Sequence, residues 1–555
     1  MGGIISLRDH ETIRFAAGEL SKLAGQCGIS EETGYVLGTW DDCSEHGISL
    51  EALTEQADLN HAPEDAYWID ARNGKVLLSG KTERAVLFAV YAYAREQWGA
   101  HYPSPTAAEK PAVEAERTPL QLPVYSEPMF ARRGFVIENV YDADFLLRMI
   151  DWLAKNRISE LFLTFMLWDQ MRDIVEPELA KRGMTLTLGG HSMKFFLNQP
   201  GPDQHTTAAA QENPYHSKWQ FNYSDDSWQD EFCSRIASYC ADIPMLTRVS
   251  MWPEDVGVNS ASGEKGDFLK GYIKFTERLQ RKLAEQAVNV AVEHIAYNAG
   301  LSWDMLEREG VNTSQTADTL FAYWGRDYSL PYSAADEAGL RAYEALQDWR
   351  NATREQSREF TIFEYYSDHF MMSWLFPALA RRIADDVIDY KRIGVDGIVD
   401  LIVPYVPKKA KPEGTVPTLE QYDWKWIHGY NSFIFASLTW GDSLQQAERN
   451  ALTAYSPEER EAVKRLLAEI ESITAPITAW NVPLFPARAA DPEKVDRSEQ
   501  TERIAELLHQ LTKLADHVPP VTAGSTSAMQ SFHAYVSGLA HWAGVLEQEW
   551  RAKLQ

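Results

Sequence analysis

Four carboxylates end or closely follow short apolar segments in the middle of the chain: Glu254, Asp255, Asp327 and Glu364. Glycosidic bond cleavage needs two carboxyl groups, one to protonate the leaving oxygen and one to activate water or attack the sugar, separated by roughly 6.5–9.5 Å for inversion and about 5–5.5 Å for retention. The pattern predicts this chemistry, with Glu254 or Asp255 opposed by Asp327 or Glu364. The alternative for each carboxylate is a helix cap or a salt bridge.

Side chains able to bind a sugar stand at the ends of the same segments: His191, Trp252, His294, Tyr297, Asn298, Arg326, Tyr365 and Tyr366. Flat aromatic rings beside carboxylates suit the faces of sugars, although each ring is equally suited to an ordinary core position. The planar guanidinium of Arg326 could hold a substrate carboxylate through two hydrogen bonds, or it could pair with its own neighbours. Further polar residues end these segments, namely Glu138, Asn139, Asp169, Ser192, Asp368 and Asp400.

Several motifs of other enzyme classes are absent from the sequence. The histidines are scattered, and the chain contains neither an HxH nor an HExxH pattern, so we predict no metal site. The sequence also lacks a nucleophile elbow, a phosphate-binding loop of the Walker type and a dinucleotide-binding glycine pattern. We therefore expect carboxylate chemistry that uses no cofactor.

The apolar segments themselves alternate with amphipathic stretches of helical length, which is typical of repeated βα units and a parallel sheet. The candidate strands cover residues 134–140, 160–167, 184–189, 247–252, 288–295, 320–324, 360–364 and 397–403. Eight such segments predict a closed (β/α)₈ barrel, in which the active site lies at the carboxyl ends of the strands. A polar, aromatic-rich insertion at 200–230 is too long for a plain connection, and we expect it to be an active-site loop.

The barrel is expected to span residues 126–445, between two other regions. Residues 1–125 predict an α+β domain, with helices over 11–23 and 82–98 and strands near 34–37, 67–70 and 75–80. The second of these helices is expected to end at Gly99. Residues 446–555 predict a helical region, in which Ser456 and Glu459 have the spacing of a capping box.

Composition excludes several classes of function. The chain has 555 residues, 45% of them hydrophobic, and a net charge of −27, so it can form a large core and would repel nucleic acid and anionic membranes. Nothing approaches 18 consecutive apolar residues, and the first twenty residues lack the features of a secretory signal. Only four cysteines are present, too sparse for a disulfide scaffold. We expect a cytoplasmic protein.

Several sequence stretches resemble a known group of enzymes. The stretch from Ala66-Tyr67-Trp68-Ile69 to Trp98-Gly99-Ala100-His101-Tyr102-Pro103 resembles the small domain that precedes the barrel in bacterial alpha-glucuronidases and hexosaminidases. Gly189-Gly190-His191-Ser192, Trp252-Pro253-Glu254-Asp255, Ala296-Tyr297 and Glu364-Tyr365-Tyr366 resemble bacterial proteins akin to alpha-glucuronidases. The resemblance covers roughly residues 10–440. It implies an inverting exo-glycosidase with Glu254 as the acid and with Asp327 and Glu364 activating water.

Two alternatives stay open at this stage. Hexosaminidases use an adjacent Asp-Glu pair after strand four for retaining, substrate-assisted cleavage, whereas this chain has the reverse order, Glu254-Asp255. The same aromatic side chains and Arg326 would also serve a carbohydrate-binding barrel without catalysis. In each case we expect an oligosaccharide as the binding partner, and the C-terminal helices could form a homodimer.

Overall fold

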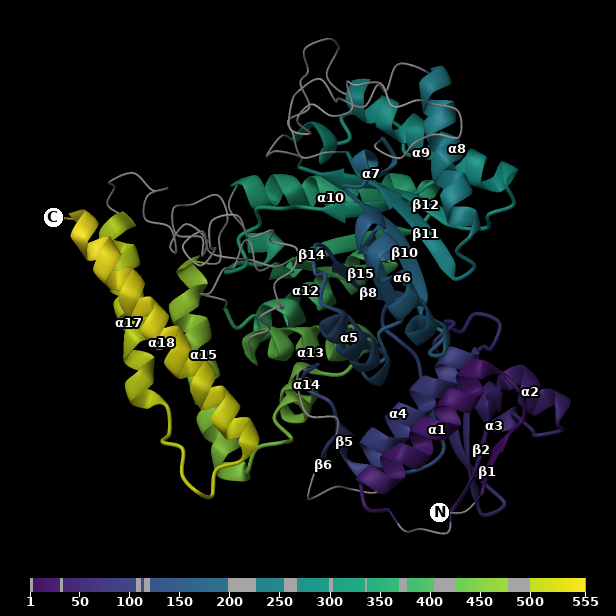
Figure 1. Cartoon of the computed structure of the whole chain (residues 1–555), viewed down its shortest axis with the longest axis horizontal. Coiled ribbons are helices and arrows are strands. Elements are labelled where there is room, and N and C mark those ends of the chain that lie inside the picture. The colour runs from purple at the N-terminus through teal and green to yellow at the C-terminus, as the bar shows by residue number, and fades with distance from the viewer. Residues whose placement is uncertain are drawn as a thin grey trace.

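The computed structural model describes residues 3–29, 33–105, 111–113, 120–197, 226–253, 267–298, 303–334, 337–368, 377–403, 426–477 and 500–554. These residues form three regions: an α+β domain at the N-terminus, a barrel, and a bundle of helices at the C-terminus (Figure 1). In the described part of the chain, the helices are all too short or too polar to cross a membrane.

The N-terminal domain is a five-stranded mixed sheet with the order β1-β2-β4-β3-β7. Its strands are β1 (Ile4–Ser6), β2 (Gly34–Thr39), β3 (Tyr67–Arg72), β4 (Lys75–Gly80) and β7 (Val124–Ser126). The helices α1 (Glu11–Gln26) and α4 (Glu83–Trp98) pack against the sheet, and two short helices, α2 (Trp40–Glu45) and α3 (Glu51–Thr54), and a small hairpin of β5 (Ala100–His101) and β6 (Ala112–Val113) complete the domain. Helix α4 ends at Gly99, which has a left-handed φ of 68° and confirms the predicted C-cap.

The central region is a closed barrel of eight parallel strands, as predicted. The strands are β8 (Arg132–Ile137), β9 (Glu160–Thr164), β10 (Thr185–Gly190), β11 (Leu246–Met251), β12 (Ala291–Tyr297), β13 (Asp318–Ala322), β14 (Phe360–Asp368) and β15 (Gly397–Val403). Strand β15 pairs with β8, which closes the barrel. The (β/α)₈ fold is therefore confirmed.

Most strand bounds differ from the prediction by one to four residues, and two of these differences bear on the carboxyl ends of the strands. Strand β9 stops at Thr164, because the Thr164 side chain accepts a hydrogen bond from the Leu167 backbone N–H and caps the helix that follows. Strand β14 continues to Asp368, four residues beyond the predicted end at Glu364. The extension places Asp368 at the carboxyl end of the strand.

Helices surround the barrel. They are α5 (Ala143–Lys155), α6 (Phe165–Ala180), α7 (Met193–Leu197), α8 (Asp226–Ala241), α9 (Asp267–Glu285), α10 (Glu337–Glu355), α12 (Ala380–Ile393) and α13 (Trp426–Trp440), with short 3-10 turns η4 (Trp303–Met305) and η5 (Tyr332–Ala334). Helix α13 is buried along most of its length, between the barrel and the helices that follow. The predicted active-site loop at 200–230 lies mostly outside the described residues.

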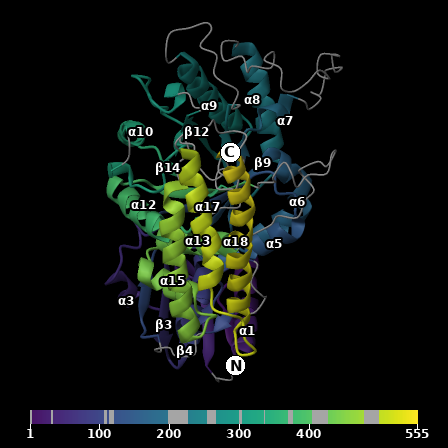
Figure 2. The ribbon, with the colours of Figure 1, turned by 90° about the vertical axis from the view of Figure 1, so that its left-hand side faces the viewer.

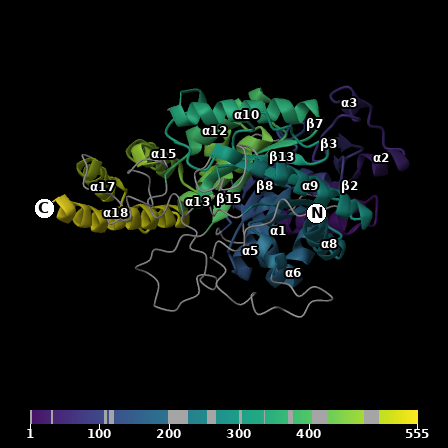
Figure 3. The same ribbon diagram turned by 90° about the horizontal axis from the view of Figure 1, so that it is seen from above.

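The C-terminal region is helical, as predicted. It contains α14 (Leu444–Ala451), α15 (Pro457–Thr474), the 3-10 turn η9 (Ala475–Ile477), α17 (Gln500–His517) and α18 (Ser527–Leu554). Ser456 and Glu459 form the predicted capping box. Helices α15, α17 and α18 run side by side along one flank of the molecule (Figure 2), on the side of the barrel away from the N-terminal domain (Figure 3). The homodimer through these helices and the boundaries near residues 125 and 445 stay predictions.

Buried ion pairs hold the N-terminal domain to the barrel. Asp65 accepts hydrogen bonds from Arg84 at 2.7 Å and from Arg133 of β8 at 2.7 Å. Asp442, which follows α13, pairs with Arg157 at 3.1 Å and with Arg95 at 3.6 Å. Because each carboxylate binds one arginine from the N-terminal domain and one from the barrel, the two regions are fixed relative to each other.

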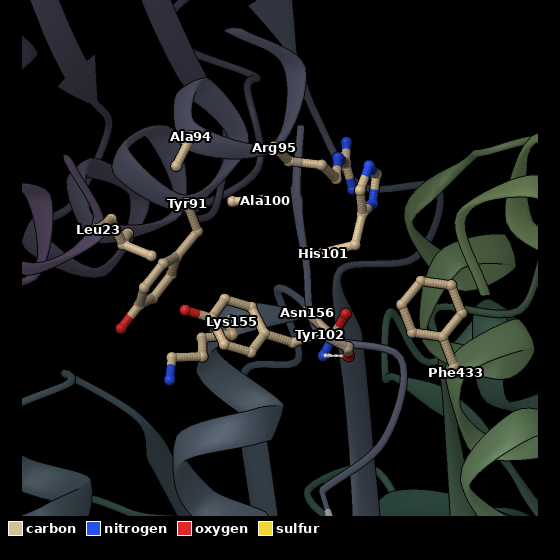
Figure 4. Close-up of a pocket in the computed structure, with 10 residues that line it drawn as sticks. All are labelled: Leu23, Tyr91, Ala94, Arg95, Ala100, His101, Tyr102, Lys155, Asn156 and Phe433. Carbon is tan, nitrogen blue, oxygen red and sulfur yellow. Dashed lines mark hydrogen bonds between the residues drawn. The ribbon is translucent and has the colours of Figure 1, made fainter. Parts of the chain in front are cut away.

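A small cavity lies in the same interface. Its lining includes Arg95 and His101 of the N-terminal domain, Lys155 of α5 and Phe433 of α13 (Figure 4). Its volume is about 10 Å³, which is room for about one water molecule rather than a sugar. Burial lowers the pKa of His101 to about 3, so this imidazole is neutral. The cavity is therefore part of the interface rather than a substrate site.

Candidate active site

The alternating side chains of the barrel strands divide into an interior set and a helix-facing set. In the interior, Trp252 lies edge-on to Phe162 of β9 and Phe363 of β14, with ring centroids 5.5 and 5.2 Å apart. The indole Nε1 of Trp252 donates to Ser250 Oγ at 2.8 Å. These rings fill the barrel and form an apolar floor below the carboxyl ends of the strands.

Charged side chains fill the opposite, amino-terminal end of the interior. Arg132 binds Glu160 at 2.7 Å and also Glu293, while Arg248 binds Asp318. Burial alone would raise the pKa of Glu160, but the Arg132 guanidinium holds it below its usual value. This layer pairs its charges internally and stabilises the barrel.

Above the aromatic floor, two side chains hold the end of β11. His191 Nδ1 lies 2.6 Å from the carbonyl oxygen of Pro253, and the Tyr297 hydroxyl donates to the same oxygen at 3.1 Å. Since a carbonyl only accepts, His191 carries a proton on Nδ1 in this hydrogen bond. Pro253 is the last described residue before Glu254 and Asp255. Its carbonyl oxygen is held in place by these two hydrogen bonds.

Glu138 faces the mouth at the end of β8. Gly190 of β10 has a φ of +73°, and a Cβ atom added there would lie 3.0 Å from Glu138 Oε1 and 3.2 Å from Thr164 Cγ2. The Glu138 carboxylate therefore lies against the backbone of Gly190, across the ends of β8, β9 and β10. Glycine at this position permits both the left-handed backbone and the close approach.

Asp368 faces the mouth from the end of β14. Its Oδ2 accepts a hydrogen bond of 3.3 Å from Trp324 Nε1. The side chain of Asn298 holds Trp324 in place by hydrogen bonds to its backbone N–H, at 2.8 Å, and to its carbonyl oxygen. Trp324 is half-buried, so an aromatic ring lies beside a carboxylate at the rim.

Glu138 and Asp368 lie on either side of β15. Asp368 is in register with Val403 of β15, and the Glu138 backbone N–H donates to Ile402 of the same strand at 3.2 Å. Neighbouring strands are about 4.8 Å apart, so the two backbones are separated by roughly 10 Å. The two carboxylates are therefore at the same level of the mouth and two strands apart.

Glu364 and Arg326 do not face the mouth. Glu364 is buried between β14 and α12, where it accepts hydrogen bonds from Arg326 at 3.0 Å, from Tyr328 at 2.7 Å and from Tyr390. Arg326 also donates to Asp386 of α12. Burial raises the pKa of Glu364, and the Arg326 charge opposes that rise. The expectation that Glu364 joins a pair of carboxylates in the mouth, and that Arg326 binds a substrate carboxylate there, does not fit this placement.

The remaining predicted residues divide in the same way. Trp252, His191, Tyr297, Asn298 and Tyr365 lie in the interior or at the rim. His294 and Tyr366 face the helices: His294 packs against Trp349 of α10, and Tyr366 donates to Asp386.

Asp327 is half-buried in the loop after β13, where its carboxylate accepts hydrogen bonds from the backbone N–H and the hydroxyl of Ser329 at 2.8 and 2.6 Å. This is a local turn, and it occupies one oxygen of the carboxylate. Glu254 and Asp255 lie outside the described residues, so their roles stay predictions. Within the described residues, no group of three or more His, Cys, Asp or Glu side chains is arranged to hold a metal ion.

Comparison with known proteins gives a likeness at the level of structure. Neither a family model nor a curated protein matches the sequence. A GH138 enzyme that targets pectin rhamnogalacturonan II aligns over 98% of this chain and 86% of its own, with a TM-score of 0.58 and 10% identity. A GH115 4-O-methyl-alpha-glucuronidase with specificity for decorated arabinogalactans aligns over 99% of this chain and 72% of its own, with a TM-score of 0.62 and 13% identity.

A third solved structure, CpGH84B, aligns over 99% of this chain and 88% of its own, with a TM-score of 0.53 and 9% identity. The chain shares its fold with these glycoside hydrolases. The shared fold extends over all three regions of this chain, because nearly its whole length aligns. At such low identities the likeness concerns the fold and leaves the chemistry to be argued from the mouth itself.

Sequence analysis named Glu138 and Asp368 as polar strand ends but gave neither a role, and it did not select Trp324. The missing information was the direction of each side chain. For Glu138 a signal was available, since strict alternation from the buried Val136 places it on the interior side of β8. For Asp368 no such signal was available. Strict alternation from Glu364 predicts that Asp368 faces the helices, whereas the extra residue in β14 turns it toward the interior.

Proposed function

We propose that the chain is a glycoside hydrolase whose active site is the carboxyl-terminal mouth of the barrel. The observation that carries the proposal is the placement of Glu138 and Asp368 on either side of β15, both directed into the mouth. Trp324 supplies an aromatic ring beside Asp368. Two carboxyl groups next to aromatic side chains are what hydrolysis of a bound sugar needs.

The reaction that we propose inverts the anomeric configuration. The backbones that carry Glu138 and Asp368 are roughly 10 Å apart by the spacing of strands, with Glu138 lying toward Gly190 of β10 and Asp368 toward Trp324. An inverting pair is separated by roughly 6.5–9.5 Å so that a water molecule fits between the sugar and the base. Glu254, the acid expected from the sequence, lies outside the described residues and stays a candidate in the proposal.

The substrate we propose is an oligosaccharide from which a terminal sugar is released. One structural neighbour is a 4-O-methyl-alpha-glucuronidase, which supports an alpha-linked uronic acid as one candidate. Arg326, the residue predicted to bind its carboxylate, is instead occupied by Glu364 and Asp386. We therefore propose the reaction class and the site, and the panel below determines the sugar.

The experiment incubates wild type with aryl glycosides and with neutral, N-acetylated and uronic-acid-bearing oligosaccharides, and follows released sugar by mass. The variants are Glu138→Gln, Asp368→Asn and Glu254→Gln. Loss of a general acid or base lowers the rate by about 10²–10⁴-fold, so at least two of the three should fall in this range. Glu359→Gln, at the opposite end of the barrel, is the control and should stay within about twofold, since its exposed carboxylate pairs with Arg248 away from the mouth.

A non-catalytic barrel would give a different result. Wild type would then cleave no member of the panel, while one member would raise its melting temperature. A retaining N-acetylhexosaminidase-like enzyme would instead cleave the N-acetylated substrates and release the sugar with its anomeric configuration retained, which NMR of the fresh product reports. Either result would replace the inverting mechanism proposed here.

A further inference from the structure

Strand β14 contains one extra residue near its carboxyl end. Glu364 is in register with Asp400 of β15, and Ser367 is in register with Ile402, so three residues of β14 advance while β15 advances by two. An extra residue of this kind is a β-bulge. Because side chains alternate between the two faces of a strand, one extra residue reverses the faces of all that follow.

The reversal decides where Asp368 lies. Phe363 faces the interior, where it contacts Trp252, and Glu364 faces α12. Strict alternation from Glu364 would turn Asp368 toward the helices as well. Instead Ser367 faces the helices, where its hydroxyl approaches Ser432 of α13 at 3.3 Å, and Asp368 faces the mouth beside Trp324.

Side chains take the place of the ladder partners at the bulge. The Tyr328 hydroxyl accepts from the Tyr365 backbone N–H at 3.3 Å and donates to Glu364 at 2.7 Å. Asp400 accepts from the backbone N–H of Tyr366, from the backbone N–H of Ser367 at 3.3 Å and from the Ser367 hydroxyl at 2.6 Å. Three consecutive backbone N–H groups are thus paired by two side chains.

Both of these side chains are buried on the helix-facing side, away from any substrate. Tyr328 is 3% exposed and Asp400 is fully buried. A buried N–H that loses its acceptor is costly, so the pairing favours the bulged strand over the regular one. Tyr328 and Asp400 therefore have a second role besides packing, since they determine the direction of the Asp368 side chain on the other face of β14.

We propose that Tyr328 and Asp400 are positioning residues that turn Asp368 into the mouth by holding the bulge in β14. The part of this inference that concerns catalysis rests on the proposed function, in which Asp368 is one of the reacting carboxylates. Neither positioning residue touches the substrate. Their effect on the rate passes through Asp368 alone.

The test compares Tyr328→Phe with Tyr390→Phe. Each variant removes one hydroxyl that donates to Glu364, but only Tyr328 also accepts from the Tyr365 N–H. Misplacing a reacting group by about 1 Å can cost about 10²-fold in rate, so Tyr328→Phe should lower kcat by about ten- to a hundredfold with KM little changed. Tyr390→Phe should stay within about threefold if the bulge, rather than Glu364, is what matters.

A double-mutant cycle separates positioning from general structural damage. In an Asp368→Asn background, Tyr328→Phe should cause no further fall in kcat, because the group through which it acts is already lost. Independent, multiplicative losses would overturn the proposal, as would unchanged kcat in Tyr328→Phe. If Tyr328→Phe fails to fold, Ser367→Ala provides the same cycle by removing one of the hydrogen bonds to Asp400.

A crystal structure of Tyr328→Phe tests the inference without any substrate. The expected result is loss of the Trp324–Asp368 hydrogen bond and a changed direction of the Asp368 side chain. An unchanged Asp368 would overturn the inference even if the chain is a glycosidase. Conversely, Asp368 could be displaced in a protein that cleaves no glycoside. That result would support the positioning role of Tyr328 and would reject the proposed function.

Discussion

Two groups of carboxylates lie on opposite sides of the barrel wall around β14, β15 and β8. Glu364 of β14 and Asp400 of β15 face the helices, where they lie with Asp386 of α12, and arginine, tyrosine and serine side chains occupy these three carboxylates. Glu138 and Asp368 face the mouth, beside a glycine backbone and a tryptophan. The comparison shows that a carboxylate at a strand end becomes a candidate for chemistry only when it faces the barrel interior.

The two groups of carboxylates also differ in the side chains that they contact. On the helix side, each carboxylate serves the packing of β14, β15 and α12, and Glu364 has a raised pKa because it is buried. On the mouth side, His191 and Tyr297 hold the carbonyl oxygen of Pro253, and Trp324 donates to Asp368. Substitutions of Glu364 and Asp386 should therefore act on stability and those in the second group on turnover, whereas Asp400 affects turnover only through the position of Asp368.

The largest expected effect comes from removing Arg326. Arg326→Leu would leave Glu364 and Asp386 buried without their cation, and breaking such a buried pair costs about 3–5 kcal/mol. Urea unfolding followed by circular dichroism measures this loss. Arg341→Leu, at an exposed ion pair with Glu307, is the matched control and should change stability by less than about 1 kcal/mol. An equally small change for Arg326→Leu would mean that the ion pairs of Arg326 with Glu364 and Asp386 do not stabilise the fold.

A second prediction compares two histidines. Burial lowers the pKa of His294 to about 4, so the folded protein keeps this ring neutral while the unfolded chain binds a proton below its ordinary pKa near 6.5. The folded pKa is depressed, so stability is lost as the pH falls from about 6.5 toward 4, by about 2 kcal/mol at pH 5.

The variant His294→Leu should therefore lose about 2 kcal/mol less than wild type between pH 7 and pH 5, measured by urea unfolding at both pH values. Its turnover should stay close to that of wild type, because the ring packs against Trp349 rather than the mouth. His191→Gln is the counterpart in the mouth and should lower turnover. The prediction would be wrong if His294→Leu lost turnover while its free energy of unfolding depended on pH as in wild type. His294 would then belong to the mouth.

A smaller effect is expected for Trp324. Trp324→Ala removes both the half-exposed ring and the hydrogen bond to Asp368. Loss of stacking and of one hydrogen bond is worth about 1–2 kcal/mol, or about five- to thirtyfold in kcat/KM. Trp324→Phe keeps a ring without the donor, so the difference between the two variants separates stacking from positioning. If both variants match wild type, Trp324 does not contact the substrate.

Much of the fold could be predicted from the sequence. The alternation of apolar segments with amphipathic stretches of helical length identified the eight strands. Gly99, Ser456 and Glu459 identified helix ends. Both features depend on local residue types. The site could be predicted only in part. Trp252, His191 and Tyr297 were identified from their positions at strand ends.

Glu364 and Asp368 show why the rest could not be predicted. Both follow the same apolar segment, and only the bulge between them places one on each face of the sheet. The bulge depends on Tyr328 and Asp400, which are 37 residues before Tyr365 and 33 residues after Ser367. Such non-local partners leave no periodic signal in a single sequence.

The most direct test of this account compares Asp368→Asn with Glu364→Gln, measuring turnover on the cleaved glycoside and urea stability for both. We predict that Asp368→Asn lowers kcat/KM by about 10²-fold or more while the free energy of unfolding changes by less than about 1 kcal/mol. Glu364→Gln should lower stability and keep turnover per folded molecule within about tenfold of wild type. Loss of turnover in Glu364→Gln together with full activity in Asp368→Asn would contradict the account.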